Sequence, residues 1–364
     1  MSSISIDIIQ KMERKKIFGV LGFGFFLPIL IIVGSFAFSG CGSVTDNSTT
    51  TTSSTTTTIA TLFSHYVADL SKIKYINQPG NSDQIAIKDR CHIAIKNTET
   101  TIEVYAPATA EVLGIAYYIV RADNVPEYAL YFKVSGTCYY FFAHLIDISS
   151  KLKAVGPSVP QPTSAWVAPT SPASVSAGEL IGYTEGTPQA HTYDFGAYDP
   201  SHKNSVANES RYSADDRYIT GVNPYLYYPE SMRTDYLVLS ANPAGTVVAT
   251  TECRGVCRDV LGTASGYWYL TSGTDATYQE KMHIISEPNE SVYWGGVGGG
   301  GYEYKTLART PLDPEKLTIG MEYGYSGPYG YLYLSLLSST EMGVYFSTTD
   351  PGSFPSSGYK TYQR

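Results

Sequence analysis

The sequence predicts a mainly β protein built from antiparallel strands. Of its 364 residues, 32 are tyrosine, which favours strands, while 33 glycines and 20 prolines favour turns. Hydrophobic residues make up 43% of the chain, which is enough to fill a core and excludes wholesale disorder. Short segments of alternating polarity are joined by turns and not by helices, which excludes a doubly wound α/β fold. The length predicts about two folded units.

The N-terminal segment has the features of an export signal. Residues 11–16 carry four basic side chains, and residues 17–39 are uncharged and mostly apolar. The order Phe38-Ser39-Gly40-Cys41 resembles a bacterial lipobox, so we predict that residues 1–41 are a lipoprotein signal peptide and that Cys41 is acylated. An uncleaved membrane anchor is the alternative, because a segment of this length spans a bilayer. Both interpretations predict an exported, membrane-anchored chain, at the cell surface or in the periplasm.

Two segments connect this signal to the first β domain. Residues 42–58 include an unbroken Ser/Thr run and are predicted to form an extended, solvated tether. Residues 59–73 place apolar side chains at helical spacing, which predicts an amphipathic helix.

The segment from 84 to 198 is predicted to be an antiparallel β domain, so that the first folded unit spans 59–200. Its residues alternate between polar and apolar in short runs bounded by turns. A proline-rich stretch at 156–174 is predicted to be an exposed loop between strands. The predicted strands cover 84–88, 92–96, 101–105, 111–115, 128–134, 138–145, 175–182 and 191–198.

Four short segments of this domain, taken in order, resemble the lysostaphin/LytM-type zinc endopeptidases, which carry the duplicated hybrid motif. Residues 104–112 are similar to the family hairpin V-x-A-P-x-x-G-x-V, and residues 140–145 are similar to Y-x-H-L. Residues 175–182 are similar to V-x-x-G-x-x-I-G, and residues 190–195 lie where the family carries H-x-H-F. The resemblance implies an antiparallel LytM-like β-sheet domain and, by family, hydrolysis of peptidoglycan cross-links.

The resemblance also implies a zinc site, from which this sequence departs. The family holds zinc with two histidines and one aspartate, so that a bound water acquires a pKa of about 7 and attacks a polarised carbonyl. The family's H-x-x-x-D motif is absent between residues 75 and 110, and the closing strand has one histidine in place of two. The matching positions leave His92 and Asp194 as candidate metal ligands, and His144 and His191 as candidate catalytic residues.

Two hypotheses follow from this departure. In the first, the domain keeps the fold, needs no cofactor, and acts as a non-catalytic binding or scaffold protein of the cell envelope. In the second, His92 and Asp194 hold zinc in a divergent peptidase, with His144 and His191 assisting catalysis. The expected partners are the membrane and, through the fold, peptidoglycan or envelope proteins. Nucleic acid is excluded, because the net charge is −8 and no basic cluster follows residue 16.

The remaining chain is predicted to form a connector and a second β domain. Residues 201–245 are rich in Tyr, Pro and Asn, and residues 246–364 contain short strands that predict a small barrel or sandwich. This domain is a third candidate for function, as a carbohydrate- or protein-binding module. Four of its aromatic residues are candidates for a platform that stacks on sugar rings, with core packing as the alternative. These are Trp268, Trp294, Tyr325 and Tyr329.

Four cysteines remain after Cys41 is assigned to lipid. An even number in an exported chain predicts disulfides, and we expect the pairs Cys91–Cys138 and Cys253–Cys257. A glycine-rich run at 296–301 matches G-x-G-x-x-G, but no helix is predicted after it, so we expect a loop and no nucleotide site.

Overall fold

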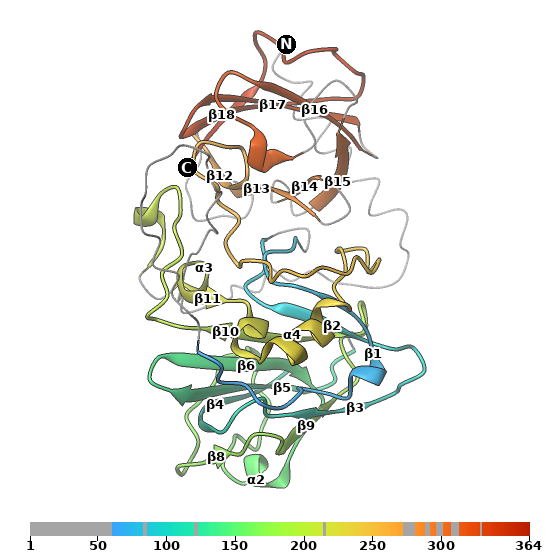
Figure 1. Ribbon diagram of the computed structural model, residues 1–364, viewed down its shortest axis with the longest axis vertical. Helices are drawn as coiled ribbons and strands as arrows, with labels where there is room; N and C mark the ends of the chain where they lie inside the picture. The colour runs from blue at the N-terminus through green and yellow to red at the C-terminus, as the bar shows by residue number, and fades with distance from the viewer. Residues whose placement is uncertain are drawn as a thin grey trace. The chain divides into compact units, whose positions relative to one another are not determined.

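The computed structural model confirms a mainly antiparallel β protein (Figure 1). It describes residues 60–82, 86–119, 123–213, 216–271, 281–287, 292–295, 301–306, 313–327 and 330–364. The predicted signal peptide, the acylated Cys41 and the tether lie outside these residues. Within the described part, no helix combines the length and the apolar composition needed to cross a membrane.

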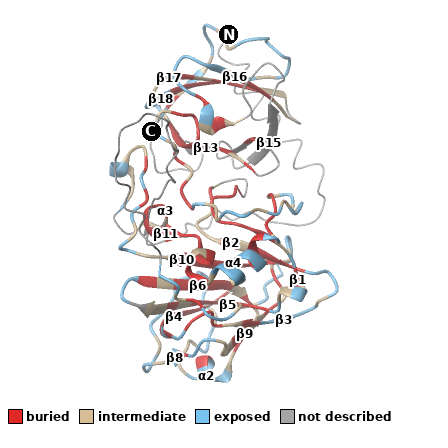
Figure 2. Ribbon diagram, viewed as in Figure 1, coloured by how far each residue is buried: buried red, intermediate tan, exposed pale blue. Residues whose placement is uncertain are grey.

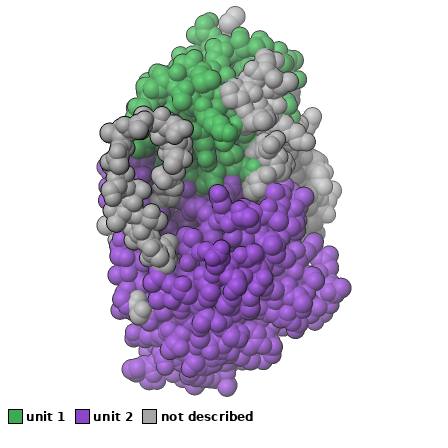
Figure 3. All heavy atoms as spheres, in the orientation of Figure 1, with its two compact units in different colours: residues 1–32, 82–87, 258–364 green, residues 33–81, 88–257 purple. Residues whose placement is uncertain are grey.

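The chain forms two compact units, which Figure 3 colours separately. Of the described residues, we call those within 60–81 and 88–257 the sheet unit, and those within 82–87 and 258–364 the barrel unit. The second unit therefore begins at residue 258, not at the predicted 246, and it includes a short segment from the first half of the chain.

The sheet unit is built around one large antiparallel sheet. Its strand order is β1-β2-β10-β6-β5-β4-β8, and β11 pairs with β10 beside this path. The bounds are β1 (Ile73–Asn77), β2 (Cys91–Ile95), β4 (Ala110–Tyr118), β5 (Glu127–Ser135), β6 (Cys138–Leu145), β8 (Ser174–Val175), β10 (Thr192–Tyr198) and β11 (Gly221–Val222). A smaller sheet has the order β3-β9-β7, with β3 (Ile102–Tyr105), β7 (Asp147–Ile148) and β9 (Leu180–Thr184).

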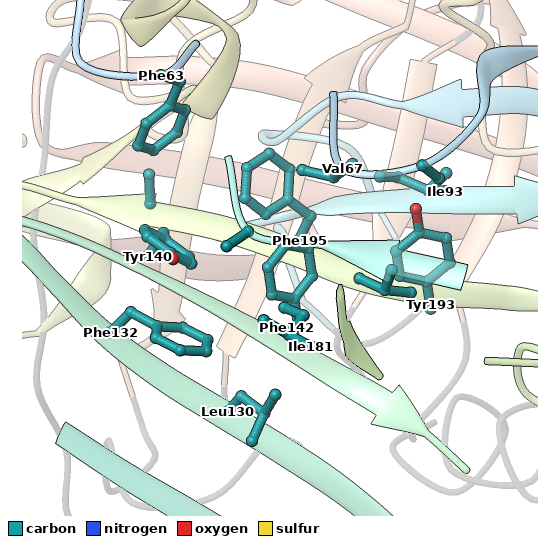
Figure 4. Packing of buried hydrophobic residues seen from close by; sticks show 14 of the residues in the cluster. Phe63, Val67, Ile93, Leu130, Phe132, Tyr140, Phe142, Ile181, Tyr193 and Phe195 are labelled. Atoms are coloured by element: carbon teal, nitrogen blue, oxygen red, sulfur yellow. The ribbon is translucent and has the colours of Figure 1, made fainter. Parts of the chain in front are cut away.

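The two faces of the large sheet differ, because side chains alternate along each strand. One face packs into the core of the unit, where Phe142, Phe195, Tyr140 and Tyr193 lie together (Figures 2 and 4). The residues between them in sequence point to the opposite face, which we call the outer face. From β2 to β4 this face carries His92, Ala94, Thr192, Asp194, Gly196, Tyr198, Tyr139, Phe141, Ala143, Ala129, Tyr131, Lys133, Gly114, Ala116 and Tyr118.

The predicted amphipathic helix over 59–73 is wrong. Within the described residues 60–73 the only helical element is the short 3-10 helix η1 (Leu70–Lys72). The backbone N–H groups of Leu62 and Phe63 donate to the carbonyl of Tyr227, so the segment finds its hydrogen bonds in the tertiary structure. Its apolar side chains are buried without helix formation, because such bonds satisfy the backbone as a helix would.

The predicted connector is an integral part of the sheet unit. Tyr225, Tyr228 and Tyr236 are buried in its core, and the rings of Tyr225 and Tyr236 stack with centroids 4.3 Å apart. Besides η1, the short helices of the unit are α2 (Ser150–Lys153), η2 (Glu209–Arg211), α3 (Arg217–Thr220), η3 (Pro224–Tyr227) and α4 (Glu230–Leu237). The tyrosine-rich composition of this segment therefore reflects core packing.

The barrel unit closes into a barrel, which decides between the two predicted architectures. The order is β12-β13-β14-β15-β16-β17-β18-β19, and β19 pairs with both β18 and β12. The bounds are β12 (Gly266–Leu270), β13 (Lys281–Ser286), β14 (Val292–Gly295), β15 (Gly301–Thr306), β16 (Glu322–Gly327), β17 (Gly330–Ser338), β18 (Glu341–Ser347) and β19 (Lys360–Gln363), with η5 (Pro314–Lys316) between β15 and β16. Strands β16 and β19 were not predicted.

Two predicted strands differ from the structure. Residues 246–250 lie in the sheet unit and form no strand beyond an isolated bridge at Val247. Of 84–88, residues 84 and 85 lie outside the described part, and Ile87 makes an isolated bridge with Ser82. Both segments alternate in polarity but have no neighbouring strand with which to form a ladder. Hydrogen-bonded pairing, more than alternation of side chains, decides whether a segment forms a strand.

The predicted aromatic platform is not formed by its described members. Trp268 is 0% exposed, its indole N–H donates to the carbonyl of Ala264, and Tyr325 is also fully buried in the barrel core. Both rings pack inside the barrel core, where burial removes a large apolar area of each ring from water. Tyr329 and the side chain of Trp294 lie outside the described part of the chain.

The predicted disulfides are wrong, because all four cysteines are free. Cys91 lies opposite Phe195 on β10, and Phe195 lies opposite Phe142 on β6, four residues from Cys138. One intervening strand and four residues of offset put the two cysteines roughly 16 Å apart, whereas a disulfide requires Cα atoms within about 7 Å.

We therefore expect that protein purified without reductant and then denatured will titrate with four thiols from these cysteines. In the folded protein the same thiols should react slowly at pH 8, because burial raises the pKa of Cys138 to about 12 and that of Cys253 to about 11. A titration that finds fewer than four thiols after denaturation would contradict the free state.

Candidate functional site

The outer face brings three of the predicted site residues together. On β2 and β10, His92 pairs directly with Asp194, and on β10 and β6, Asp194 pairs with Ala143. His144 follows Ala143, so the three polar side chains meet where these strands are neighbours. His92 Nε2 lies 3.7 Å from Asp194 Oδ1, and His144 Nε2 lies 3.7 Å from Asp194 Oδ2.

A β-bulge places His144 in this cluster. Between the pairs Tyr128–Leu145 and Leu130–Phe142, strand β6 has one more residue than β5. His144 has a φ of 66°, in the left-handed region that non-glycine residues rarely adopt, and Thr184 Oγ1 donates to its carbonyl at 2.6 Å. Bulges re-aim side chains and are frequent beside functional sites, as is strained backbone.

Two residues that sequence reasoning missed complete the cluster. Glu127, the fully buried first residue of β5, has its Oε2 2.9 Å from His144 Nδ1. Because a carboxylate only accepts hydrogen bonds, Nδ1 of His144 carries the proton. Arg90, just before β2, donates from Nη1 to Asp194 Oδ2 at 3.0 Å.

These groups form a chain of alternating charges, which we call the ion chain. It runs from Glu127 through His144, Asp194 and Arg90 to Asp89 and then to Arg217. Arg90 Nε lies 2.6 Å from Asp89 Oδ1, and Arg217 Nη1 lies 3.2 Å from Asp89 Oδ2. Asp194 and Asp89 each face an arginine, which is the arrangement that a buried charge requires, and Glu127 faces His144, which is a cation when protonated.

The pKa values of the ion chain follow from this arrangement. Burial by itself raises the pKa of Asp194, but the charges of Arg90, His144 and His92 outweigh it and lower that pKa to about 2. Burial lowers the pKa of His144, yet the charge of Asp194 and the hydrogen bond to Glu127 raise it above its usual value. Arg90 and Arg217 likewise outweigh the burial of Asp89 and hold the pKa of its carboxyl low.

The fourth predicted residue, His191, points elsewhere. It precedes β10 with a φ of 54°, and its Nδ1 lies 3.2 Å from the carbonyl of Ile95. A glycine at 186 is required here, because a Cβ on Gly186 would stand 2.5 Å from the carbonyl carbon of His191. His191 is therefore part of a tight loop, with its ring against the backbone of Ile95.

A site that holds a metal ion needs at least three converging side chains, and the cluster around Asp194 can be compared with this requirement. Among the described residues, no three His, Cys, Asp or Glu side chains converge as ligands for one ion. His92 and Asp194, the predicted ligands, are adjacent, but the guanidinium of Arg90 bonds the carboxylate of Asp194. Two signals were available for the missed residues: Arg90 stands two positions before His92, and Glu127 precedes a run of five apolar or aromatic residues.

Comparison with known proteins finds only distant similarity. No protein-family model and no curated protein matches the sequence. Two solved structures of the SpoIIQ–SpoIIIAH complex, one described as pore-forming, contain similar chains: TM-scores are 0.29 and 0.27 at 10% and 11% identity, covering 47% and 44% of this chain and 92% and 96% of those. The solution structure of lysostaphin is similar with a TM-score of 0.26 at 12% identity, covering 82% of this chain and 90% of lysostaphin.

Proposed function

We propose that this chain is a non-catalytic, membrane-anchored protein of the cell envelope that uses a LytM-like sheet domain for binding. The observation that carries the proposal is the ion pair between Arg90 and Asp194, with Nη1 and Oδ2 3.0 Å apart. Asp194 is the carboxylate that the family resemblance offers as a metal ligand. A guanidinium bound to it supplies the compensating charge that a zinc ion would otherwise supply.

Electrostatics favours this interpretation over catalysis. Catalytic zinc sites use three protein ligands and keep one position for water. Here one candidate carboxylate is engaged by Arg90, and His144 is held between Glu127 and Asp194. A divalent cation placed beside the guanidinium would be repelled at close range, because the site is shielded from solvent. The residues present therefore fit a metal ion poorly.

The anchoring part of the proposal rests on the sequence. The basic segment, the apolar segment and Cys41 have the order of a lipoprotein signal, and the Ser/Thr tether after Cys41 gives the folded units reach from the lipid surface. The partners proposed are the membrane, through the lipid at Cys41, and peptidoglycan or envelope proteins, through the folded units.

Metal analysis tests the non-catalytic function most directly. We expect protein purified in the presence of zinc, after gel filtration, to retain far less than one ion per chain. The matched variant is Arg90→Ala, which removes the competing cation while keeping both histidines. Stoichiometric zinc in the unsubstituted protein that disappears on His92→Ala would overturn the proposal.

A second candidate function is a divergent zinc peptidase, and the backbone of His144 favours it. A histidine held at positive φ by a bulge, and oriented through Nδ1 by a buried glutamate, resembles a catalytic group more than a structural one. Its test is chelator-sensitive release of peptides from purified cell wall. Release that is lost in His144→Ala but kept in the exposed His65→Ala control would establish this function, and no release at any zinc concentration would exclude it.

A further inference from the structure

Aromatic side chains form a row on the outer face, beside the arginines of the ion chain. We call Trp166, Tyr131, Phe141, Tyr198 and Tyr139 the aromatic row. The ring centroids of Trp166 and Tyr131 are 5.8 Å apart, and those of Tyr131 and Phe141 are also 5.8 Å apart. The guanidinium of Arg217 stacks 4.2 Å above Phe141 and lies 5.7 Å from the ring of Tyr198, which stacks on Tyr139 at 4.8 Å.

The exposed end of the row is held in place by the backbone. Trp166 is 47% exposed, and its ring packs on Gly114 so closely that a Cβ there would stand 2.2 Å from the indole. The next residue, Val167, exchanges two backbone hydrogen bonds with Ile115 on β4. An exposed indole fixed at both its ring and its backbone loses little entropy when a ligand covers it.

Two arginine side chains beside the row are partly exposed, although the protein as a whole is acidic. In the ion pairs beside Phe141 the side chains of Arg217 and Arg90 are 26% and 27% exposed, whereas those of Asp89 and Asp194 are 17% and 9% exposed. The carboxylate side chains are therefore less exposed than the arginine side chains that pair with them. Lys133 lies on the same face, in register with Tyr139 and with Glu111.

We propose that the aromatic row is a binding site for a polysaccharide that carries carboxylate groups. Sugar rings present apolar C–H faces that stack on aromatic rings, here on the exposed Trp166 and the half-buried Tyr131, Tyr139 and Tyr198. Phe141 is buried beneath Arg217 and supports that guanidinium, which can pair with a carboxylate. The inference deepens the proposed envelope-binding function and rests on it. It assigns the binding surface to the sheet unit, on residues other than the platform predicted in the barrel.

The position of the row favours a polysaccharide over a peptide strand. A peptide commonly binds a sheet by adding to a free edge through backbone hydrogen bonds. The row crosses β5, β6 and β10 in the middle of the large sheet, where every strand is already paired on both sides. Recognition here must therefore use side chains: aromatic rings, hydroxyl groups and the guanidinium groups of Arg217 and Arg90, with Lys133 and Glu111 opposite each other on β5 and β4.

The test measures binding of the full chain in detergent to alginate oligosaccharides, with neutral dextran oligosaccharides and poly-glutamate as comparison ligands. We expect alginate to bind and dextran to bind much more weakly, with added salt weakening the alginate interaction. Trp166→Ala should weaken alginate binding roughly 3- to 10-fold. Trp166→Phe should restore most of it, and Val159→Ala, in the same loop and 62% exposed, should leave it unchanged.

Several outcomes would overturn this inference. They are an absence of alginate binding, equal binding of dextran, stronger binding of poly-glutamate, and alginate binding that Trp166→Ala leaves unchanged. A sedimentation assay with purified cell wall separates this inference from the function on which it rests. If Trp166→Ala still binds the cell wall, only the assignment of binding to the aromatic row is rejected. If the unsubstituted protein does not bind the cell wall, the proposed envelope-binding function is rejected.

Discussion

Replacing Asp194 with alanine is expected to lower the free energy of unfolding of the sheet unit by about 3–5 kcal/mol. Asp194 is buried and accepts a hydrogen bond from Arg90 at 3.0 Å, with His144 and His92 each 3.7 Å away. Its loss removes the carboxylate between the Arg90 guanidinium and the two histidines, in a site from which water is largely excluded. Urea denaturation followed by circular dichroism measures the change.

The matched control is an exposed ion pair of the same unit. Lys203 and Glu209 are 2.8 Å apart but 60% and 58% exposed, so Lys203→Ala should cost about 0–1 kcal/mol. The double variant Arg90→Met/Asp194→Leu should recover much of the stability, because a buried ion pair is often replaceable by apolar groups. If Asp194→Ala destabilises no more than Lys203→Ala, the ion chain has no structural importance.

Replacing Trp268 with alanine should destabilise the barrel unit by about 3–5 kcal/mol. The indole is fully buried, donates to the carbonyl of Ala264 at 2.9 Å, and lies 4.1 Å from the guanidinium carbon of Arg364. The substitution opens a cavity and removes both interactions. Differential scanning calorimetry should show the transition of the barrel unit at a lower temperature.

A second tryptophan provides the control for this experiment. Trp166 is 47% exposed, so Trp166→Ala should change the stability of its own unit far less. A surface platform at Trp268 would give the reverse pattern: little loss of stability and a loss of binding. Unchanged calorimetry of Trp268→Ala would therefore contradict its place in the core.

The fold class follows from local patterns that do not depend on tertiary structure. Alternating polarity and the frequency of Tyr, Gly and Pro predict antiparallel strands, and the strongest segments, β6 and β10, appear where expected. The same patterns place His92 and Asp194 on strands, and alternation turns both side chains toward one face.

Tertiary structure decided what the apolar residues of 60–73 and 201–257 do. The spacing of Phe63 and Val67 fits a helix, but backbone bonds to Tyr227 and from Tyr105 hold the segment extended. The spacing of apolar residues predicts which side chains are buried, but it does not fix the backbone, because several backbone conformations bury the same residues. The tyrosines of the predicted connector are likewise core residues, because distant strands supply their neighbours.

Only part of the candidate site was predictable, because motifs locate single residues and strand pairing decides which of them meet. His92, His144 and Asp194 follow from motif positions, whereas Arg90 and Glu127 join them only through the strand order β2-β10-β6-β5. The sequence by itself determined an antiparallel β protein with a histidine and an aspartate on one sheet face. Only the tertiary structure decided that a guanidinium faces that aspartate, because pairing between strands far apart in sequence sets which charges meet.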